Sequence, residues 1–335
     1  MVQPLPPQIS PLAERVLSVT TRAEFDGLAL ELFHLHAARN PVYRAFLAGA
    51  RIDPGRVTTV DEIPHLPIGL FRGHKVLLDD LAPAVSFTSS GTTGTATSTH
   101  HVPWPALYER SFMTSFTSVY TDPASWRILA LLPAYMERPG SSLVYMAERL
   151  IVATEDPLSG TYLHQFAELA EVLRVSEADE RPTLLLGVPF ALLDLAERFP
   201  TPLRNTVIME TGGMKGRRPE MVRAELHTVL RQAFGVEVVH GEYGMTELLS
   251  QAWSTGHGLY RCPPWMQVRI REVNDPFARV ALGRTGGIDV IDLANIGSCP
   301  FISTQDLGRA HADGSFEVLG RFDNSDLRGC NLLGA

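Results

Sequence analysis

Apolar positions in the first part of the chain follow a helical period. Between residues 25 and 36 they recur at the spacing of one helix face, which predicts an amphipathic helix, and a second short helix is expected over 41–47. A turn-rich stretch follows these helices. We therefore expect a helical N-terminal region over residues 1–80 that packs on the rest of the molecule.

From residue 81 onward, short apolar runs alternate with helical stretches. Strands are expected at 84–87, 128–132, 183–188, 206–209 and 236–239. Helices are expected at 104–120, 141–150, 163–173, 190–198 and 219–234. Apolar strands spaced by helices predict an α/β core, 81–259, with a mostly parallel sheet covered on both faces. In such sheets ligands bind beyond the carboxyl ends of the strands.

The pattern changes near residue 260 to period-two alternation. Short strands bounded by Gly and Asp are expected at 268–270, 287–291 and 314–319. This predicts a β-rich subdomain over 260–320, followed by a hinge-like C-terminal tail over 321–335. Because no low-complexity linker separates the parts, we expect subdomains that share one core rather than independent domains.

Charge and composition narrow the class of protein. A net charge of -8 argues against a general affinity for nucleic acid or anionic membranes. No apolar run approaches the roughly 18 residues of a membrane span, and the N-terminus lacks the features of a signal peptide. The three cysteines have neither metal-ligand spacing nor a disulfide pattern. A cytoplasmic protein is therefore expected.

A loop of small residues follows the strand expected at 84–87. Residues 89–99 are all Ser, Thr, Gly or Ala, and a helix is expected shortly after them. Glycines let backbone N–H groups approach a phosphate closely, and the hydroxyls add further donors. The loop lacks the lysine of a Walker motif. Two interpretations stay open for the loop by itself, a phosphate site and a flexible linker.

Four polar segments at or beyond the ends of expected strands favour the phosphate site over the flexible linker. They are S-S-G-T-T-G at 89–94, Y-G-M-T-E at 243–247, T-Q-D-L-G at 304–308 and G-R-F-D-N-S-D-L-R-G at 320–329. In this order they resemble the phosphate loop, the Tyr-Gly-x-Thr-Glu segment, the ribose-binding aspartate segment and the hinge of the adenylate-forming (ANL) superfamily. The resemblance implies the fold of that superfamily's N-terminal domain, mostly parallel sheets covered by helices plus a small β subdomain.

A narrower resemblance covers about residue 71 to the end. The segments at 132–138, 140–146, 210–217 and 328–333 resemble the acyl-protein synthetase (LuxE) family of fatty-acid reductase systems. This implies a ligase that uses ATP and Mg²⁺ to convert a carboxylic, by family likeness a fatty, acid into an acyl-adenylate. The acyl group then passes to a thiol, with an acyl-CoA reductase or other acyl-acceptor protein as partner.

Two alternatives to this function stay open. One is an acyl-CoA ligase of the phenylacetate-CoA ligase type, with free CoA as the acceptor. The other is a nucleotide-binding subunit of a fatty-acid reductase complex, with little activity of its own. The sequence does not identify the acid, the final acceptor or the oligomeric state.

The resemblance assigns the nucleotide contacts to particular residues. The β- and γ-phosphates fall to hydroxyls and glycine amides of the loop, from Ser89, Ser90, Gly91, Thr92, Thr93 and Gly94. Adenine falls to Tyr243 and Gly244, with close backbone approach allowed by Gly212 and Gly213.

The segment after Tyr243 is assigned to the reacting phosphate. The Thr246 hydroxyl suits the α-phosphate, and Glu247 supplies a hard oxygen for Mg²⁺. An alternative for Glu247 is a carboxylate in the first turn of a helix, where it would offset the helix dipole. Asp306 suits both ribose hydroxyls, or else forms a turn. Arg321 has a planar fork for ribose or phosphate oxygens, or else is a surface arginine.

Two departures from the superfamily concern Lys215 and Cys330. The mobile lid domain is expected to be missing or truncated, because no lysine follows Lys215. Lys215 therefore becomes a candidate for contact with phosphate or carboxylate, against a capping or surface role. Cys330, near the C-terminus, is a candidate acyl acceptor, because a thiolate can attack an acyl-adenylate. Its alternative is a small residue packed beside neighbouring leucines.

Overall fold

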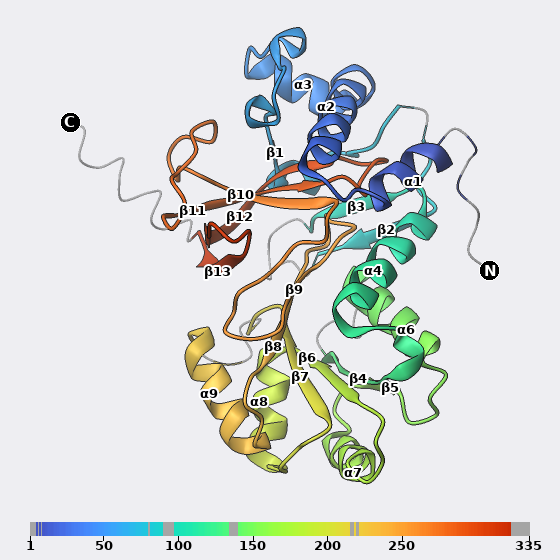
Figure 1. Ribbon diagram of the computed structural model, residues 1–335. Coiled ribbons are helices and arrows are strands. Elements are labelled where there is room, and N and C mark those ends of the chain that lie inside the picture. The colour runs from blue at the N-terminus through green and yellow to red at the C-terminus, as the bar shows by residue number, and fades with distance from the viewer. Residues whose placement is uncertain are drawn as a thin grey trace.

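The computed structural model describes residues 5, 7, 9–79, 81–89, 97–133, 140–214, 218 and 221–322. Its first elements are the helices α1 (Ser10–Leu17), α2 (Arg22–Arg39) and α3 (Pro41–Gly49) (Figure 1). A capping box begins α2, in which the Thr21 hydroxyl accepts from the Glu24 N–H and the Glu24 carboxylate accepts from the Thr21 N–H. The two predicted N-terminal helices are confirmed.

A six-stranded sheet forms the lower half of the molecule in Figure 1. Its strand order is β5 (Gly160–Tyr162), β4 (Arg127–Leu131), β6 (Thr183–Gly187), β7 (Thr206–Thr211), β8 (His240–Tyr243) and β9 (Ala252–Ser254). The first five strands are parallel, and β9 runs antiparallel to β8. Since all carboxyl ends of the parallel strands meet at one edge, the polar residues that follow β7 and β8 lie together there.

Helices cover this sheet on both sides. In Figure 1, α8 (Pro189–Arg198) and α9 (Arg223–Phe234) lie on one side and α4 (Pro105–Tyr120) and α6 (Ser142–Thr154) on the other. The remaining long helix of the described residues is α7 (Phe166–Ser176). The α/β class with a mostly parallel, helix-covered sheet is thus confirmed.

One strand of the sheet differs from its prediction. The apolar run at 236–239 is not a strand, and β8 begins only at His240. Gly235 ends α9 with a φ of +66°, in the left-handed region that favours glycine, and residues 236–239 connect the helix to the sheet. The strand itself reads His-Gly-Glu-Tyr, which hydropathy does not mark as a buried strand.

The second large sheet has five strands and is mainly antiparallel. Its path is β1 (Leu66–Pro67), β12 (Phe301–Ala310), β11 (Thr285–Asp292) and β10 (Met266–Arg271), and β13 (Phe316–Arg321) pairs with β12. Only β1 pairs in the parallel sense. This sheet lies beside α1–α3 in the upper half of Figure 1.

A two-stranded hairpin brackets the small-residue loop. Strand β2 (Val85–Thr88) pairs antiparallel with β3 (Thr99–Val102), with Phe87 opposite His100. The sequence predicted β2 but not β3, because Thr-His-His-Val carries little apolar signal. The loop therefore joins two strands of a hairpin before α4 begins, rather than leading from a strand directly into a helix.

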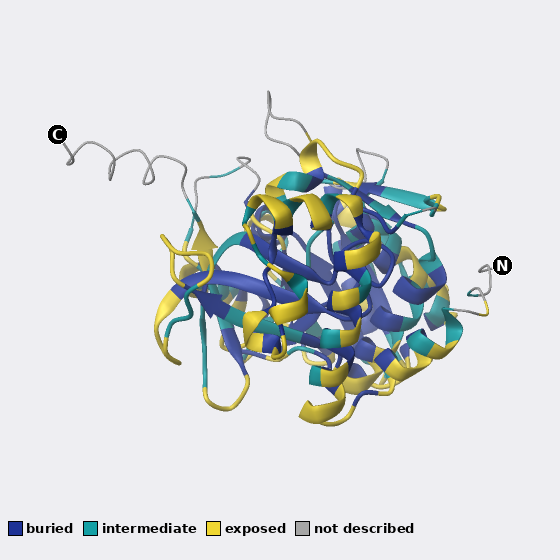
Figure 2. Cartoon of the chain, turned by 90° about the horizontal axis from the view of Figure 1, so that it is seen from above, coloured by how far each residue is buried: buried dark blue, intermediate teal, exposed yellow. Residues whose placement is uncertain are grey.

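Buried apolar side chains from both large sheets and the N-terminal helices form one continuous cluster. Figure 2 shows the buried residues in dark blue along the chain. A loop that runs from Asp292, the last residue of β11, to Cys299, shortly before β12, is buried at every position. Loops usually run over the surface because their backbone polar groups need partners. The partners of this buried loop are both backbone groups and side chains, and the side chains become important at the site.

Candidate functional site

Three predicted residues from two sheets meet at one place. Tyr243 ends β8, Asp306 lies in β12, and Arg321 ends β13. The Tyr243 hydroxyl donates to Asp306 Oδ2 at 2.9 Å, and Arg321 Nε lies 3.4 Å from Asp306 Oδ1. Asp306 and Arg321 are direct partners in the β12–β13 register. An aromatic ring, a carboxylate and a guanidinium thus form one group.

The group is buried at one end and open at the other. Tyr243 packs edge-on against Tyr260 and Phe316, with ring centroids 6.1 and 5.5 Å away. The Arg321 side chain is 69% exposed. Burial raises the pKa of Asp306, while the charge of Arg321 lowers it. Within the described residues, the terminal nitrogens of Arg321 form no ion pair and lie beside an anchored carboxylate.

The glycines after β7 lie at the same sheet edge. Thr211, the last residue of β7, is opposite Glu242 in β8, so Gly212 and Gly213 follow directly beside Tyr243. Gly212 has a φ of +74°, a backbone conformation that residues other than glycine rarely adopt. At Gly244, an added Cβ would lie 2.4 Å from Glu242 Oε1. Glycine is therefore favoured at 212 by the backbone conformation and at 244 by the buried Glu242 side chain, independently of any ligand.

Thr246 and Glu247 lie in a turn between β8 and β9. No helix begins at Glu247, so a first-turn helix carboxylate is excluded as its role. The Glu247 side chain is buried, and burial raises the pKa of its carboxyl while the nearby Ser98 hydroxyl lowers it. Among the described residues Glu247 forms no ion pair. Such a carboxyl has oxygen atoms left for a ligand.

The backbone of this turn is fixed by side chains from distant segments. His100 Nδ1 lies 2.8 Å from the Thr246 carbonyl oxygen, and Asn295 Nδ2 donates to the Glu247 carbonyl at 2.8 Å. His100 Nε2 in turn lies 3.1 Å from Asn295 Oδ1. Both His100 and Asn295 are fully buried. Asn295 carries no signal in the sequence, and the position of His100 directly after the loop favours a structural role over contact with phosphate, which agrees with its burial.

Ser89 closes the base of the hairpin. Its hydroxyl accepts from the Ser98 N–H at 3.0 Å, and its N–H donates to the Ser98 carbonyl at 3.0 Å. Ser90, Gly91, Thr92, Thr93 and Gly94, and likewise Lys215 and Cys330, lie outside the described residues. Their predicted roles therefore stay predictions.

Two buried carboxyl groups at this edge were not predicted. Glu210 accepts from Arg223 Nε at 2.8 Å and from the Tyr260 hydroxyl at 3.2 Å. Glu242 accepts from the Thr211 hydroxyl, and burial raises its pKa to about 7. The only sequence signal for them was a Glu within each polar segment at a strand end.

The described side chains fit a magnesium ion that is held mainly by the phosphates of a bound molecule and only in part by the protein. Within the described part of the chain, no three His, Cys, Asp or Glu side chains gather as an all-protein metal site. Mg²⁺ typically uses one or two carboxylates and completes its shell with phosphates and water. A single buried and unpaired Glu247 beside a candidate phosphate loop fits that pattern.

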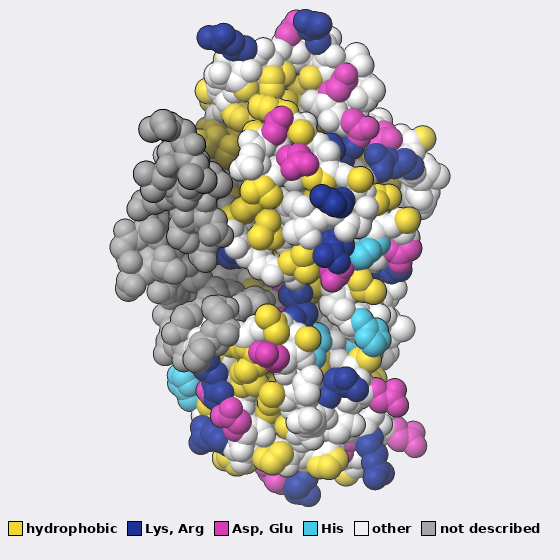
Figure 3. Space-filling view, turned by 90° about the vertical axis from the view of Figure 1, so that its left-hand side faces the viewer, with side chains coloured by type: hydrophobic (Ala, Val, Ile, Leu, Met, Phe, Trp, Pro, Cys, Tyr) yellow, Lys and Arg dark blue, Asp and Glu magenta, His cyan; other side chains and the backbone are white. Residues whose placement is uncertain are grey.

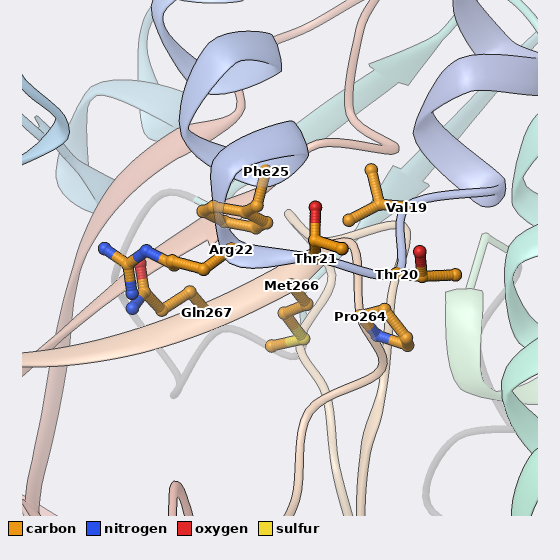
Figure 4. Close-up of a pocket in the computed structure, with 8 residues that line it drawn as sticks. All are labelled: Val19, Thr20, Thr21, Arg22, Phe25, Pro264, Met266 and Gln267. Atoms are coloured by element: carbon orange, nitrogen blue, oxygen red, sulfur yellow. The ribbon is translucent and has the colours of Figure 1, made fainter.

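A cavity of about 260 Å³ lies elsewhere, between the start of α2 and the chain around Met266 (Figure 4). Phe25 and Met266 supply apolar surface, and Arg22 at its rim is paired with Asp26 at 2.7 Å. None of its lining residues was predicted to bind a ligand.

On the face in Figure 3, basic, acidic and apolar side chains are interspersed. No helix in the described ranges is long and apolar enough to cross a membrane.

Comparison with known proteins finds similar solved structures. The chain superposes on ATP-bound MatB from Rhodopseudomonas palustris with a TM-score of 0.54 and 19% identity, over 74% of this chain and 49% of that one. A 2-hydroxyisobutyryl-CoA ligase in complex with 2-HIB-AMP and CoA gives 0.63 and 18%, over 96% and 73%. The luciferase-like enzyme of the mealworm Zophobas morio gives 0.51 and 19%, over 77% and 62%.

These likenesses establish the fold. The chain has the fold of adenylate-forming enzymes, and it spans about half the length of the MatB structures that it matches. No family model matches the sequence. No curated protein matches it either. The narrower likeness to acyl-protein synthetases therefore rests on the sequence segments alone.

Proposed function

We propose that this chain activates a carboxylic acid with ATP, forming an acyl-adenylate and pyrophosphate, and then transfers the acyl group to a thiol. The observation that carries the proposal is the contact of Tyr243, Asp306 and Arg321 at the sheet edge. Tyr243 offers a flat face to a base, Asp306 accepts from ribose hydroxyls, and Arg321 donates to ribose or phosphate oxygens. A base, a ribose and phosphates are the groups that a nucleotide presents together.

The chemistry asked of the protein is positioning and charge neutralisation. A carboxylate oxygen of the acid attacks the α-phosphorus of ATP, and the bond to pyrophosphate breaks. Thr246 would donate its hydroxyl to the α-phosphate, and Glu247 would hold the magnesium ion. When bound, this ion neutralises phosphate charge. The loop from Ser89 to Gly94 would hold the leaving pyrophosphate.

The acyl-protein synthetase likeness supports a finer proposal. The acid would be a fatty acid, and Cys330 would attack the acyl-adenylate as a thiolate, releasing AMP and forming a thioester. A reductase or another acceptor protein would then receive the acyl group. Lys215 would take part of the role that a lid lysine has in the wider superfamily. These steps rest on sequence resemblance.

A second candidate has support of its own. The 2-hydroxyisobutyryl-CoA ligase, which covers 96% of this chain, was solved with its acyl-adenylate and CoA. Free CoA would then replace Cys330 as the acceptor, and no protein thioester would form. Both candidates share the adenylation step and differ only in the thiol.

The decisive test is ATP–pyrophosphate exchange across a panel of carboxylic acids, including fatty, aromatic and small hydroxy acids. Exchange that depends on an added acid is the expected result. Folded protein that gives no exchange with any acid would contradict adenylation.

Intact-protein mass spectrometry then identifies the thiol. We expect an acyl adduct that Cys330→Ser abolishes while exchange persists, with Cys262→Ser as the matched control that keeps the adduct. Thioester found only on added CoA would favour the second candidate. An adduct that survives Cys330→Ser would exclude Cys330 as acceptor.

A further inference from the structure

The turn that carries Thr246 and Glu247 is bound by side chains rather than by a neighbouring strand or helix. Its own backbone supplies one bond, from the Leu248 N–H to the Met245 carbonyl at 3.1 Å. The carbonyls of Thr246 and Glu247 are bound by His100 and Asn295. The position of these two carbonyls therefore depends on two side chains from elsewhere in the chain.

The orientation of Asn295 follows from its surroundings. Its Nδ2 lies 2.8 Å from the Glu247 carbonyl and 3.0 Å from the Cys299 carbonyl. Since both oxygens can only accept, the amide nitrogen has to face them, which leaves Oδ1 facing His100. The amide is thus fixed by two bonds at one end and a contact at the other.

The His100 ring is held by one hydrogen bond and by packing. Burial lowers its pKa to about 4, and a neutral ring that donates from Nδ1 has no second N–H for Asn295 Oδ1. A backbone carbonyl can only accept, so Nδ1 has to donate to Thr246. Phe71 packs edge-on against the ring, with centroids 6.0 Å apart, and no part of His100 is exposed. The ring belongs to β3, the strand by which the chain leaves the small-residue loop.

We propose that His100 and Asn295 are positioning residues that set the Thr246–Glu247 backbone relative to the strand leaving the candidate phosphate loop. The proposal deepens the proposed function and rests on it for its effect on rate. Thr246 and Glu247 would contact the α-phosphate and the metal, while the loop would hold the other two phosphates. Displacement by about 1 Å can cost on the order of 100-fold in rate when groups must be aligned.

The same buried loop provides a matched control. Asn40 of the N-terminal region donates from Nδ2 to the Ser298 carbonyl at 2.6 Å and is also fully buried. Asn40 and Asn295 are thus buried asparagines that donate to carbonyls of loop 292–299. Only Asn295 also bonds to the turn at 246–247. A stability effect is expected from both, and an effect on catalysis from Asn295 alone.

The activity test compares His100→Ala, His100→Gln and Asn295→Ala with Asn40→Ala. We expect kcat for ATP–pyrophosphate exchange to fall about 30- to 100-fold in His100→Ala and Asn295→Ala, with KM for the acid within about twofold. His100→Gln should recover part of the loss, since its amide can donate to Thr246. Asn40→Ala should keep kcat within about twofold at a comparable melting temperature. Equal losses in the Asn295 and Asn40 variants would overturn the proposal.

A second measurement does not depend on activity. In hydrogen–deuterium exchange of the free protein, peptides over 244–250 should take up deuterium faster in His100→Gln and Asn295→Ala, but not in Asn40→Ala. Unchanged uptake in the first two variants would overturn the positioning role, whatever the protein does. If His100→Ala does not fold, His100→Gln and Asn295→Ala carry both tests. A wild type without exchange activity contradicts the proposed function instead.

Discussion

The two large sheets bury very different interiors. In the six-stranded sheet, β4 and β6 are buried at every position, and their central residues are Ile, Leu and Ala. In the five-stranded sheet, Asp289 is fully buried within β11 and pairs with Arg271 Nη1 at 2.9 Å and with Arg279. The centre of the first sheet is held by non-directional apolar packing, whereas the second sheet depends on a particular charge arrangement within it.

The charge arrangement reaches the candidate site. Arg271 Nη2 donates to the Thr304 carbonyl at 2.8 Å, and the Thr304 hydroxyl accepts from the Asp306 N–H at 3.1 Å. The pairing around Asp289 thus continues into the segment that presents Asp306. The six-stranded sheet supplies the edge at which the candidate site lies, whereas the charged pairs of the five-stranded sheet orient Asp306 at that edge.

The largest expected effect is loss of the buried acid. Asp289→Ala leaves Arg271 and Arg279 without their common partner inside the protein, so the free energy of unfolding should fall by about 3–5 kcal/mol. Urea denaturation measures this loss. Asp313→Asn, which affects an exposed pair with Arg261, is the control and should barely move the midpoint. A change as small as the control's would mean that the charges do not hold this sheet together.

An apolar cavity tests the other sheet. Leu185→Ala in β6 removes a fully buried side chain, which should cost about 2–5 kcal/mol of unfolding free energy. Leu185 is an apolar residue of β6 and is not part of the candidate site. Nucleotide binding by the folded variant should therefore be unchanged. Weakened binding at low temperature, where the variant is folded, would show that the two sheets are less separable than proposed.

A pH effect is expected from Glu242. Its folded pKa of about 7 lies above the ordinary 4.5, so between these values the folded protein binds more protons than the unfolded chain. The free energy of unfolding should therefore fall as pH rises from 4.5 to 7, by at most about 3 kcal/mol. Glu242→Gln should be more stable than wild type above pH 7 and lose this slope. Denaturation curves at pH 5 and 8 measure both, and parallel slopes would contradict the assignment.

The smallest effect is expected at the open group. Tyr243→Phe keeps the ring but removes the hydroxyl that bonds to Asp306, so KM for ATP should rise by about 3- to 10-fold with kcat nearly unchanged. In Asp306→Asn the same substitution should have less effect, because the charged partner is already gone. Independent effects in the double variant would mean that Tyr243 does not orient Asp306.

The sequence predicted most of the apolar architecture and the residue types of the site. The parallel strands with apolar runs and the order of the polar segments were sufficient for the fold class. Strand β8 was misplaced, because Gly241 to Tyr243 are buried through tertiary contacts and not through their own hydropathy. Propensity and period cannot detect a strand of that kind.

The polar supports of the site were beyond sequence reasoning. Asn295, Arg271 and Glu210 act through hydrogen bonds to particular partners elsewhere in the chain, and an isolated Asn, Arg or Glu has no periodic signature. His100 could be singled out only as a histidine next to a loop. Its actual partner, the Thr246 carbonyl, lies 146 positions away.

The buried loop 292–299 has a consequence for the order in which the protein is made. His36 Nε2 contacts the Ile296 carbonyl across 260 positions of sequence, and Asn40 reaches Ser298 across 258. Contacts this distant cannot form until loop 292–299 has left the ribosome, and they slow folding. A nascent chain that ends before this loop has the turn of Thr246 and Glu247 but lacks the hydrogen bond from Asn295 that holds it. The protein should therefore remain inactive until this loop has been synthesised and packed.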